Sequence, residues 1–175
     1  YLFVTKQKIE HGLMLSSGQG TGKGTMATIL QKLSGEPKNH VNPSHMKGDH
    51  QSWMLNKRLI RIEELKEYND PNFYNRLKTY FTEPTYTVNL KYRDPFEYDN
   101  ISCFFIASNY INPLALDADD RRFFYYHSNA TKRPIEYWED LRKYLFDEGG
   151  IWAFRNYLEK KYLPRLDLAK FPYEP

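Results

Sequence analysis

The strongest chemical signal in the sequence is a glycine-rich loop that contains one lysine. Glycines alternate with other residues between positions 18 and 24, an apolar segment (12–15) precedes them, and a segment with helical spacing (26–33) follows. Backbone N–H groups of such a loop, and of the helix after it, bind phosphate oxygens, while the lysine reaches the β- and γ-phosphates. The loop therefore predicts ATP binding through Gly18, Gln19, Gly20, Thr21, Gly22, Lys23, Gly24 and Thr25.

The loop departs twice from the common pattern G-x-x-x-x-G-K-[ST]. Ser17 stands where that pattern has its first glycine, and Gly24 stands where it has a hydroxyl residue. The side chain that binds Mg²⁺ must then come from Thr25, or water must replace it. The alternative is a glycine-rich turn without a ligand, against which the strand–loop–helix context argues.

Two adjacent acids follow a second predicted strand, 58–62. One carboxylate is needed to hold Mg²⁺, and another to orient or deprotonate the attacking water. We expect Glu63 to serve the metal and Glu64 to serve the water. The alternative is a pair of solvated acids at the start of a helix, where negative charge is favourable.

Three further polar residues are candidates for catalysis. Asn109 follows the apolar run 101–107, and its amide can contact the γ-phosphate or the attacking water. Arg121 or Arg122 can stabilise charge on the transferring phosphoryl group, often from a neighbouring subunit. The alternatives are a turn asparagine and a local salt-bridge cluster with the preceding aspartates.

The order of predicted elements favours an α/β fold with a mainly parallel sheet flanked by helices. Predicted strands are 12–15, 40–41, 58–62, 85–91, 96–98, 101–107 and 121–126, and predicted helices are 26–33, 67–82 and the region after Pro134. Ligands bind at the carboxyl ends of parallel strands, so the loop, the acids and Asn109 should converge. We expect an ATPase core at 1–130, and a C-terminal helical segment and tail at 131–175.

The predicted hairpin around residues 85–98 carries basic and aromatic side chains. Lys78, Lys91, Tyr92 and Arg93 are candidates for binding single-stranded DNA, because cations follow the phosphate backbone and an aromatic ring stacks on bases. The alternative is a hairpin whose charges only keep it soluble.

Composition adds weaker constraints. The net charge of +3 is compatible with a nucleic-acid partner but is no evidence for one by itself. The single cysteine, Cys103, excludes an intrachain disulfide and fits a reducing compartment. No apolar run is long enough to cross a membrane, so we expect no membrane partner.

In these motifs the chain resembles the superfamily 3 helicases, a branch of the AAA+ ATPases found in phage and plasmid primase-helicases and primase-polymerases. Residues 18–25 resemble their Walker A loop, 59–64 their Walker B strand, and 78–91 the motif that leads into a DNA-contacting hairpin. Residues 104–109 resemble the sensor strand, and 120–123 the arginine-finger segment. The resemblance covers roughly residues 10–130.

The resemblance implies a P-loop ATPase of the AAA+ type, which uses ATP and Mg²⁺ and acts as a hexameric ring on single-stranded DNA. It implies a helicase domain that follows a primase or polymerase domain in the same chain, which fits a start at Tyr1 rather than Met. Its location would be the cytoplasm, that of the host if phage-encoded. Two alternatives remain, a DNA-binding or loading ATPase that does not unwind and a small-molecule kinase.

Overall fold

The computed structural model describes residues 8–35, 39–48, 51–66, 70–117 and 119–165. Its centre is a five-stranded sheet with the order β2-β3-β6-β1-β7, in which every neighbouring pair of strands is parallel. The strands are β1 (Gly12–Ser17), β2 (His40–Val41), β3 (Leu59–Ile62), β6 (Cys103–Ser108) and β7 (Phe123–Ser128). The predicted α/β class with a mainly parallel sheet is confirmed.

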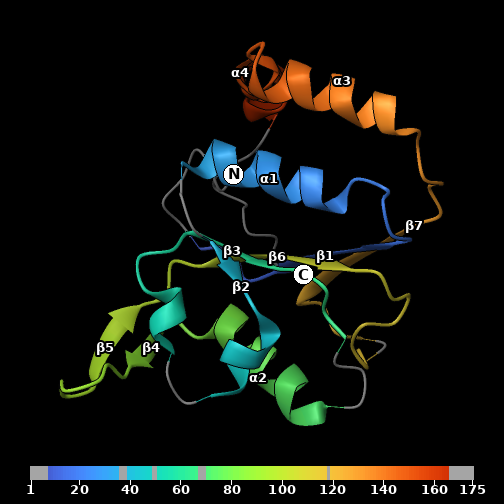
Figure 1. The fold of residues 1–175 in the computed structure, drawn as a ribbon. Coiled ribbons are helices and arrows are strands. Elements are labelled where there is room, and N and C mark those ends of the chain that lie inside the picture. Colours follow the sequence, from blue (N-terminus) through green and yellow to red (C-terminus); the bar gives the residue numbers. More distant parts are fainter. Residues whose placement is uncertain (1–7, 36–38, 49–50, 67–69, 118, 166–175) are drawn as a thin grey trace.

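Helices cover both faces of the sheet, as Figure 1 shows. Helix α1 (Lys23–Ser34) lies on one face and α2 (Pro71–Thr82) on the other. Helices α3 (Ile135–Phe146) and α4 (Gly150–Lys161) form a further layer over α1 (Figure 1). Short 3-10 turns occur at Pro43–Lys47, Gln51–Met54 and Leu163–Arg165.

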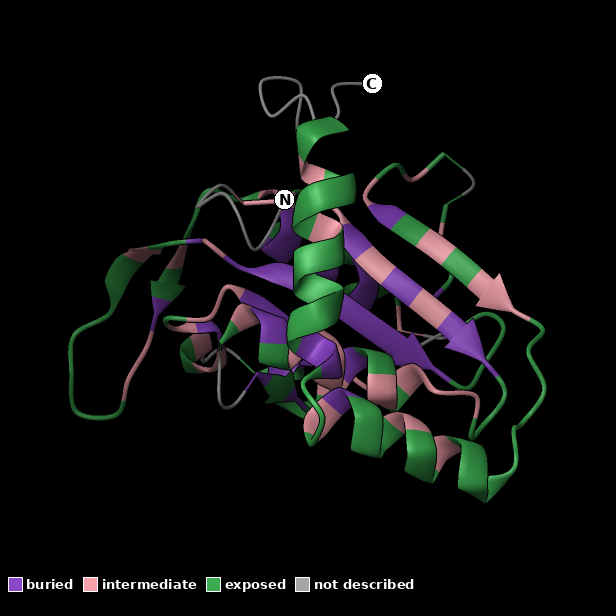
Figure 2. Ribbon diagram, turned by 90° about the horizontal axis from the view of Figure 1, so that it is seen from above, coloured by how far each residue is buried: buried purple, intermediate pink, exposed green. Residues whose placement is uncertain are grey.

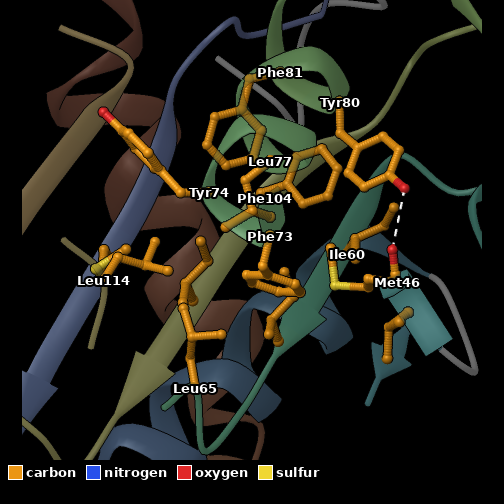
Figure 3. Close-up of a cluster of buried hydrophobic side chains, with 14 of the residues drawn as sticks. Met46, Ile60, Leu65, Phe73, Tyr74, Leu77, Tyr80, Phe81, Phe104 and Leu114 are labelled. Carbon is orange, nitrogen blue, oxygen red and sulfur yellow. Dashed lines mark hydrogen bonds between the residues drawn. The ribbon is translucent and has the colours of Figure 1, made fainter. Parts of the chain in front are cut away.

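The larger part of the core lies between the sheet and α2, where burial of apolar side chains stabilises the fold. Figure 3 shows Phe73, Leu77 and Phe81 of α2 beside Ile60 and Phe104 of the sheet. The rings of Phe81 and Phe104 have their centroids 4.7 Å apart. The apolar side chains of α2 therefore share one face, which packs on the sheet.

Two smaller clusters attach the other helices. Ala27 of α1 packs on Leu59, Phe105 and Ala107 of the sheet. Leu33 of α1 packs with Leu145 of α3 and Ile151 of α4. Most of α4 beyond this contact is exposed, as Figure 2 shows.

Several element boundaries differ from the predicted ones. The strand expected at 85–91 ends earlier, because β4 (Thr85–Val88) and β5 (Phe96–Asp99) pair only up to Val88↔Phe96 and the chain then turns. Strand β7 starts at Phe123, so Arg121 and Arg122 precede it. Helix α2 begins at Pro71, where the Asp70 side chain accepts from Phe73 N, and residues 67–69 of the predicted helix lie outside the described part. Of the expected C-terminal segment 131–175, residues 166–175 also lie outside it.

None of the described helices combines the length and the apolar character needed to cross a bilayer.

Candidate functional site

A cavity of about 690 Å³ lies at the carboxyl edge of the parallel sheet. The glycine-rich loop, the acids after β3 and Asn109 after β6 all line it, so the expected convergence is observed. Further lining residues come from the segment around the start of α3. The charged and aromatic lining side chains include Lys23, Arg61, Glu63, Glu64, Lys132 and Trp138.

The lysine of the loop folds back over the loop itself. Lys23 Nζ donates to the backbone oxygens of Ser17 and Gly18, each at 2.8 Å, and to Ser17 Oγ at 3.1 Å. Partial burial lowers the pKa of Lys23 from its usual value. The ammonium group therefore lies against the backbone of Ser17 and Gly18, at the start of the loop.

Two glycines of the loop adopt backbone conformations that side chains disfavour. Gly20 has φ +77° and Gly22, the N-cap of α1, has φ +100°. A Cβ at Gly22 would also lie 2.6 Å from the Trp138 ring. Glycine at positions 20 and 22 is therefore required by the loop geometry.

Ser17, the first departure from the common pattern, stabilises the loop. Its side chain is buried, and Ser17 Oγ lies 2.6 Å from Thr21 Oγ1. Thr21 Oγ1 in turn donates to the Gly18 carbonyl oxygen at 2.8 Å. A serine here closes the loop with side-chain hydrogen bonds.

Gly24, the second departure, leaves open space. A Cβ built on Gly24 would meet no atom within 4 Å. Thr25 lines the cavity one residue further along α1. Among the described residues, no cluster of three or more His, Cys, Asp or Glu side chains could hold a metal.

The two acids after β3 occupy different environments. Glu63 accepts a hydrogen bond and forms an ion pair with Arg61, whose guanidinium also donates to Gln31. Glu64 is exposed and has φ +58°, a left-handed conformation that is uncommon for a residue other than glycine. The acids also border a second cavity of about 460 Å³, lined in addition by His40, Asn42, Pro43, Ser44, Lys47 and Lys66.

Arg61 is a site residue that the motif analysis missed. It lies in the middle of β3, is only 8% exposed and still reaches the cavity. A buried arginine must be paired, and Gln31 and Glu63 provide the partners. The sequence signal that could have identified Arg61 is its position as an arginine inside the otherwise apolar run 59–62.

Arg121 and Arg122 lie at the opposite edge of the sheet and do not line the cavity. Gly12, the first residue of β1, donates its N–H to the Arg122 carbonyl oxygen at 2.8 Å, whereas the loop follows the last residue of β1. Asp120 accepts from Arg122 N at 2.8 Å and lies 3.4 Å from its guanidinium, while Arg121 is exposed. The two arginines therefore differ in how they are held.

The hairpin carries three of the four predicted DNA-binding residues. Lys91, Tyr92 and Arg93 are exposed between β4 and β5, and Tyr92 is 101% exposed with φ +64°. Lys78 instead lies on α2, with its ammonium group 4.1 Å from the Tyr74 ring centroid and 3.8 Å from Asp117. Lys78 therefore lies on the helix that precedes the hairpin.

Five cavity residues come from beyond the expected core boundary at residue 130. Lys132 and Arg133 precede α3, and Ile135, Trp138 and Arg142 lie on it. The basic pair before Pro134 was the only sequence signal for them. Residues from both sides of that boundary thus line one cavity.

Comparison with known proteins places these features in a family. A family model described as "Family of unknown function (DUF5906)" matches residues 14–122, and thus ends before the cavity residues of α3. A DNA primase-polymerase of Nitratiruptor phage NrS-1 is 26% identical over 142 residues, which are 79% of this chain and 20% of that protein. The chain is homologous to this relative but spans only about a fifth of its length.

Two solved structures of the C-terminal region of the NrS-1 protein share the fold. An apo structure has a TM-score of 0.67 at 23% identity, covering 79% of this chain and 36% of that one. An A-form apo structure has a TM-score of 0.59 at 26% identity, covering 71% of this chain and 30% of that one.

Proposed function

This chain belongs to the family of unknown function DUF5906, and we propose that it is the ATP-hydrolysing motor domain of a phage-type replication protein. The observation that carries the proposal is the single cavity shared by the lysine loop, the acids after β3 and Asn109. Its position at the carboxyl edge of a parallel sheet is where such folds bind ligands. The order β2-β3-β6-β1-β7 also fits a P-loop ATPase of the AAA+ type.

The charges of the cavity support a nucleoside triphosphate as the substrate. Lys23 would exchange its loop acceptors, Ser17 and Gly18, for oxygens of the β- and γ-phosphates. The N–H groups at the start of α1 would bind the same phosphates. Arg61 would remain with Glu63 and fix the direction of that carboxylate.

The acids divide the chemistry according to their environments. Glu64, exposed and without an ion pair among the described residues, would take the proton of the attacking water. Asn109 would contact the same water or the γ-phosphate. Thr25 and Glu63 offer oxygen atoms to Mg²⁺, which would neutralise phosphate charge.

Assembly into a ring would bring the predicted arginine finger of one subunit to the cavity of its neighbour. Six residues of β7 separate Arg122 from the carboxyl edge, roughly 20 Å at the usual rise per residue. Neither Arg121 nor Arg122 would therefore reach the phosphates in its own subunit, and a finger from this pair would act on the cavity of a neighbouring subunit. Arg121 is the better candidate for this finger, because Asp120 already holds Arg122.

The exposed hairpin supports single-stranded DNA as the polymer along which the motor domain moves. Lys91 and Arg93 would contact phosphates, and Tyr92 would stack on a base. By analogy with the NrS-1 relative, we place the domain beside a primase or polymerase domain of the same chain, in the host cytoplasm. The same ATP site would also serve a loader that does not unwind DNA.

One experiment tests the proposed function and distinguishes a helicase from a loader that does not unwind DNA. The full-length protein is given ATP, Mg²⁺ and a forked duplex, and phosphate release and strand displacement are followed together. We expect single-stranded DNA to stimulate hydrolysis and ATP to drive displacement. Stimulated hydrolysis without displacement would identify a loading or remodelling ATPase, and no hydrolysis would contradict the proposal.

A further inference from the structure

We propose that residues 132–142 form the wall of this cavity that binds the nucleobase and the outer phosphates of the triphosphate. Trp138 would stack on the base, and Lys132, Arg133 and Arg142 would bind phosphate oxygens. The inference rests on the proposed function, because it assigns further parts of the same site.

The wall touches the phosphate loop at its two left-handed glycines. A Cβ on Gly20 would lie 3.2 Å from the aliphatic carbons of Lys132, and a Cβ on Gly22 would lie 2.6 Å from Trp138 Cη2. These side chains approach the loop backbone closely only because both residues lack a side chain. Residues 132–142 therefore pack directly against the phosphate loop.

The wall supplies positive charge that is not neutralised nearby. Lys132, Arg133 and Arg142 join Lys23 and Arg61 in the cavity, whereas the described part of the chain contributes two lining carboxylates, Glu63 and Glu64. Within the described residues, the three cations of the wall form no ion pair; Arg133 lies over the Tyr137 ring and Arg142 over the Phe146 ring. Such an excess of cations suits a polyphosphate anion.

Helix α3 is held in place by its second half, which leaves its first half available to the ligand. Leu141, Leu145 and Phe146 pack with Ile29 and Leu33 of α1, which fixes the second half of the helix. The first half has little support, with Ile135 68% and Tyr137 49% exposed. Figure 1 shows α3 lying along α1, so its start and the phosphate loop are at the same end.

Trp138 is the aromatic side chain of the cavity lining. Its ring is partly exposed, with one edge on Gly22 and Tyr137 in edge contact at 5.1 Å between centroids. An aromatic face beside a phosphate site stacks on nucleobases of any identity. The ligand class is therefore a nucleoside triphosphate, with the base held mainly by stacking.

Two probes separate the base from the phosphates: ATP, and inorganic tripolyphosphate, which has no base. Dissociation constants are measured by titration calorimetry for the wild type and for Trp138→Ala, Trp138→Phe and Arg142→Ala. Trp152→Ala is the matched control, because Trp152 is 63% exposed on α4 and does not line the cavity. Circular dichroism verifies that each variant is folded.

We expect Trp138→Ala to weaken ATP binding by about tenfold or more and to leave tripolyphosphate binding within about twofold. Trp138→Phe should keep most of the ATP affinity, since it retains a ring, and Trp152→Ala should change nothing. Arg142→Ala should weaken both ligands.

Wild-type ATP affinity in folded Trp138→Ala and Arg142→Ala, together with loss of ATP binding in Lys23→Ala, would overturn this inference alone. Equal losses of ATP and tripolyphosphate in Trp138→Ala would overturn the stacking role. Failure of the wild type to bind either ligand would instead overturn the proposed function.

Discussion

Lys23 Nζ lies 2.8 Å from the backbone oxygen of Ser17, the residue that stands where phosphate loops commonly have their first glycine. Ser17 Oγ is also 2.6 Å from Thr21 Oγ1, so a single residue holds both the lysine and the turn. The loop conformation is thus fixed by contacts of its own side chains. In the proposed function, Lys23 would exchange these acceptors for phosphate oxygens.

Restoring the missing hydroxyl at position 24 tests the Mg²⁺ assignment. The position has room for a side chain, so Gly24→Ser should fold normally and reach half-maximal ATPase rate at a lower Mg²⁺ concentration. Gly24→Ala is the matched control, because it adds Cβ without oxygen. Both should raise the free energy of unfolding by about 0.5 kcal/mol, since glycine is a poor helix former. An identical Mg²⁺ requirement in the two variants would show that residue 24 lies outside the metal site.

The paired acids should respond differently to loss of charge. Glu64→Gln should bind ATP normally but hydrolyse it about a hundredfold more slowly, because the base for the attacking water is lost. Glu63→Gln should chiefly raise the Mg²⁺ requirement and lower Tm, since it removes the charge partner of the buried Arg61. Rates close to wild type in both variants would make the pair solvated surface acids.

Much of the fold was predictable, because its signals are local. The strand–loop–helix unit, the Asp70 cap and the buried face of α2 follow from spacing that a single element displays. The convergence of the loop, the acids and Asn109 follows from parallel strands alone. Local pattern failed at β4, where alternation continues to Lys91 but pairing with β5 stops at Val88.

The missed site residues depend on contacts between distant parts of the chain. Arg61 has a role only because Gln31, thirty residues earlier, lies beside it. Trp138 reaches Gly22 only because α3 packs along α1 through a separate apolar cluster. Neither contact produces a residue pattern of fixed spacing that could be recognised in the sequence.

The two arginines should be separable by complementation. Arg121→Ala should lose most ATPase activity without loss of stability, whereas Arg122→Ala should lower Tm because the Asp120 carboxylate loses the guanidinium that forms its ion pair. Mixing Arg121→Ala with Lys23→Ala should restore part of the activity, since some interfaces then combine an intact finger with an intact loop. With mixed rings verified by mass spectrometry, a complete lack of recovery would argue that Arg121 acts within its own subunit or not at all.

The hairpin should affect DNA binding and leave the chemistry intact. Lys91→Ala should lower single-stranded DNA affinity and reduce the slope of log affinity against log salt by about 0.7. Basal ATP hydrolysis should stay close to wild type. Lys160→Ala on exposed α4 is the matched control for the loss of one charge. Unchanged affinity and salt slope in Lys91→Ala would assign the hairpin charges to solubility.

The central claim is that ATP is hydrolysed in the cavity around Lys23. The most direct test measures Mg²⁺-dependent phosphate release from ATP by the wild type, Lys23→Ala and Lys32→Ala, the last removing an exposed lysine from the same helix. We predict wild-type release in Lys32→Ala and no release above background in folded Lys23→Ala. Turnover at the wild-type rate in folded Lys23→Ala would contradict the account.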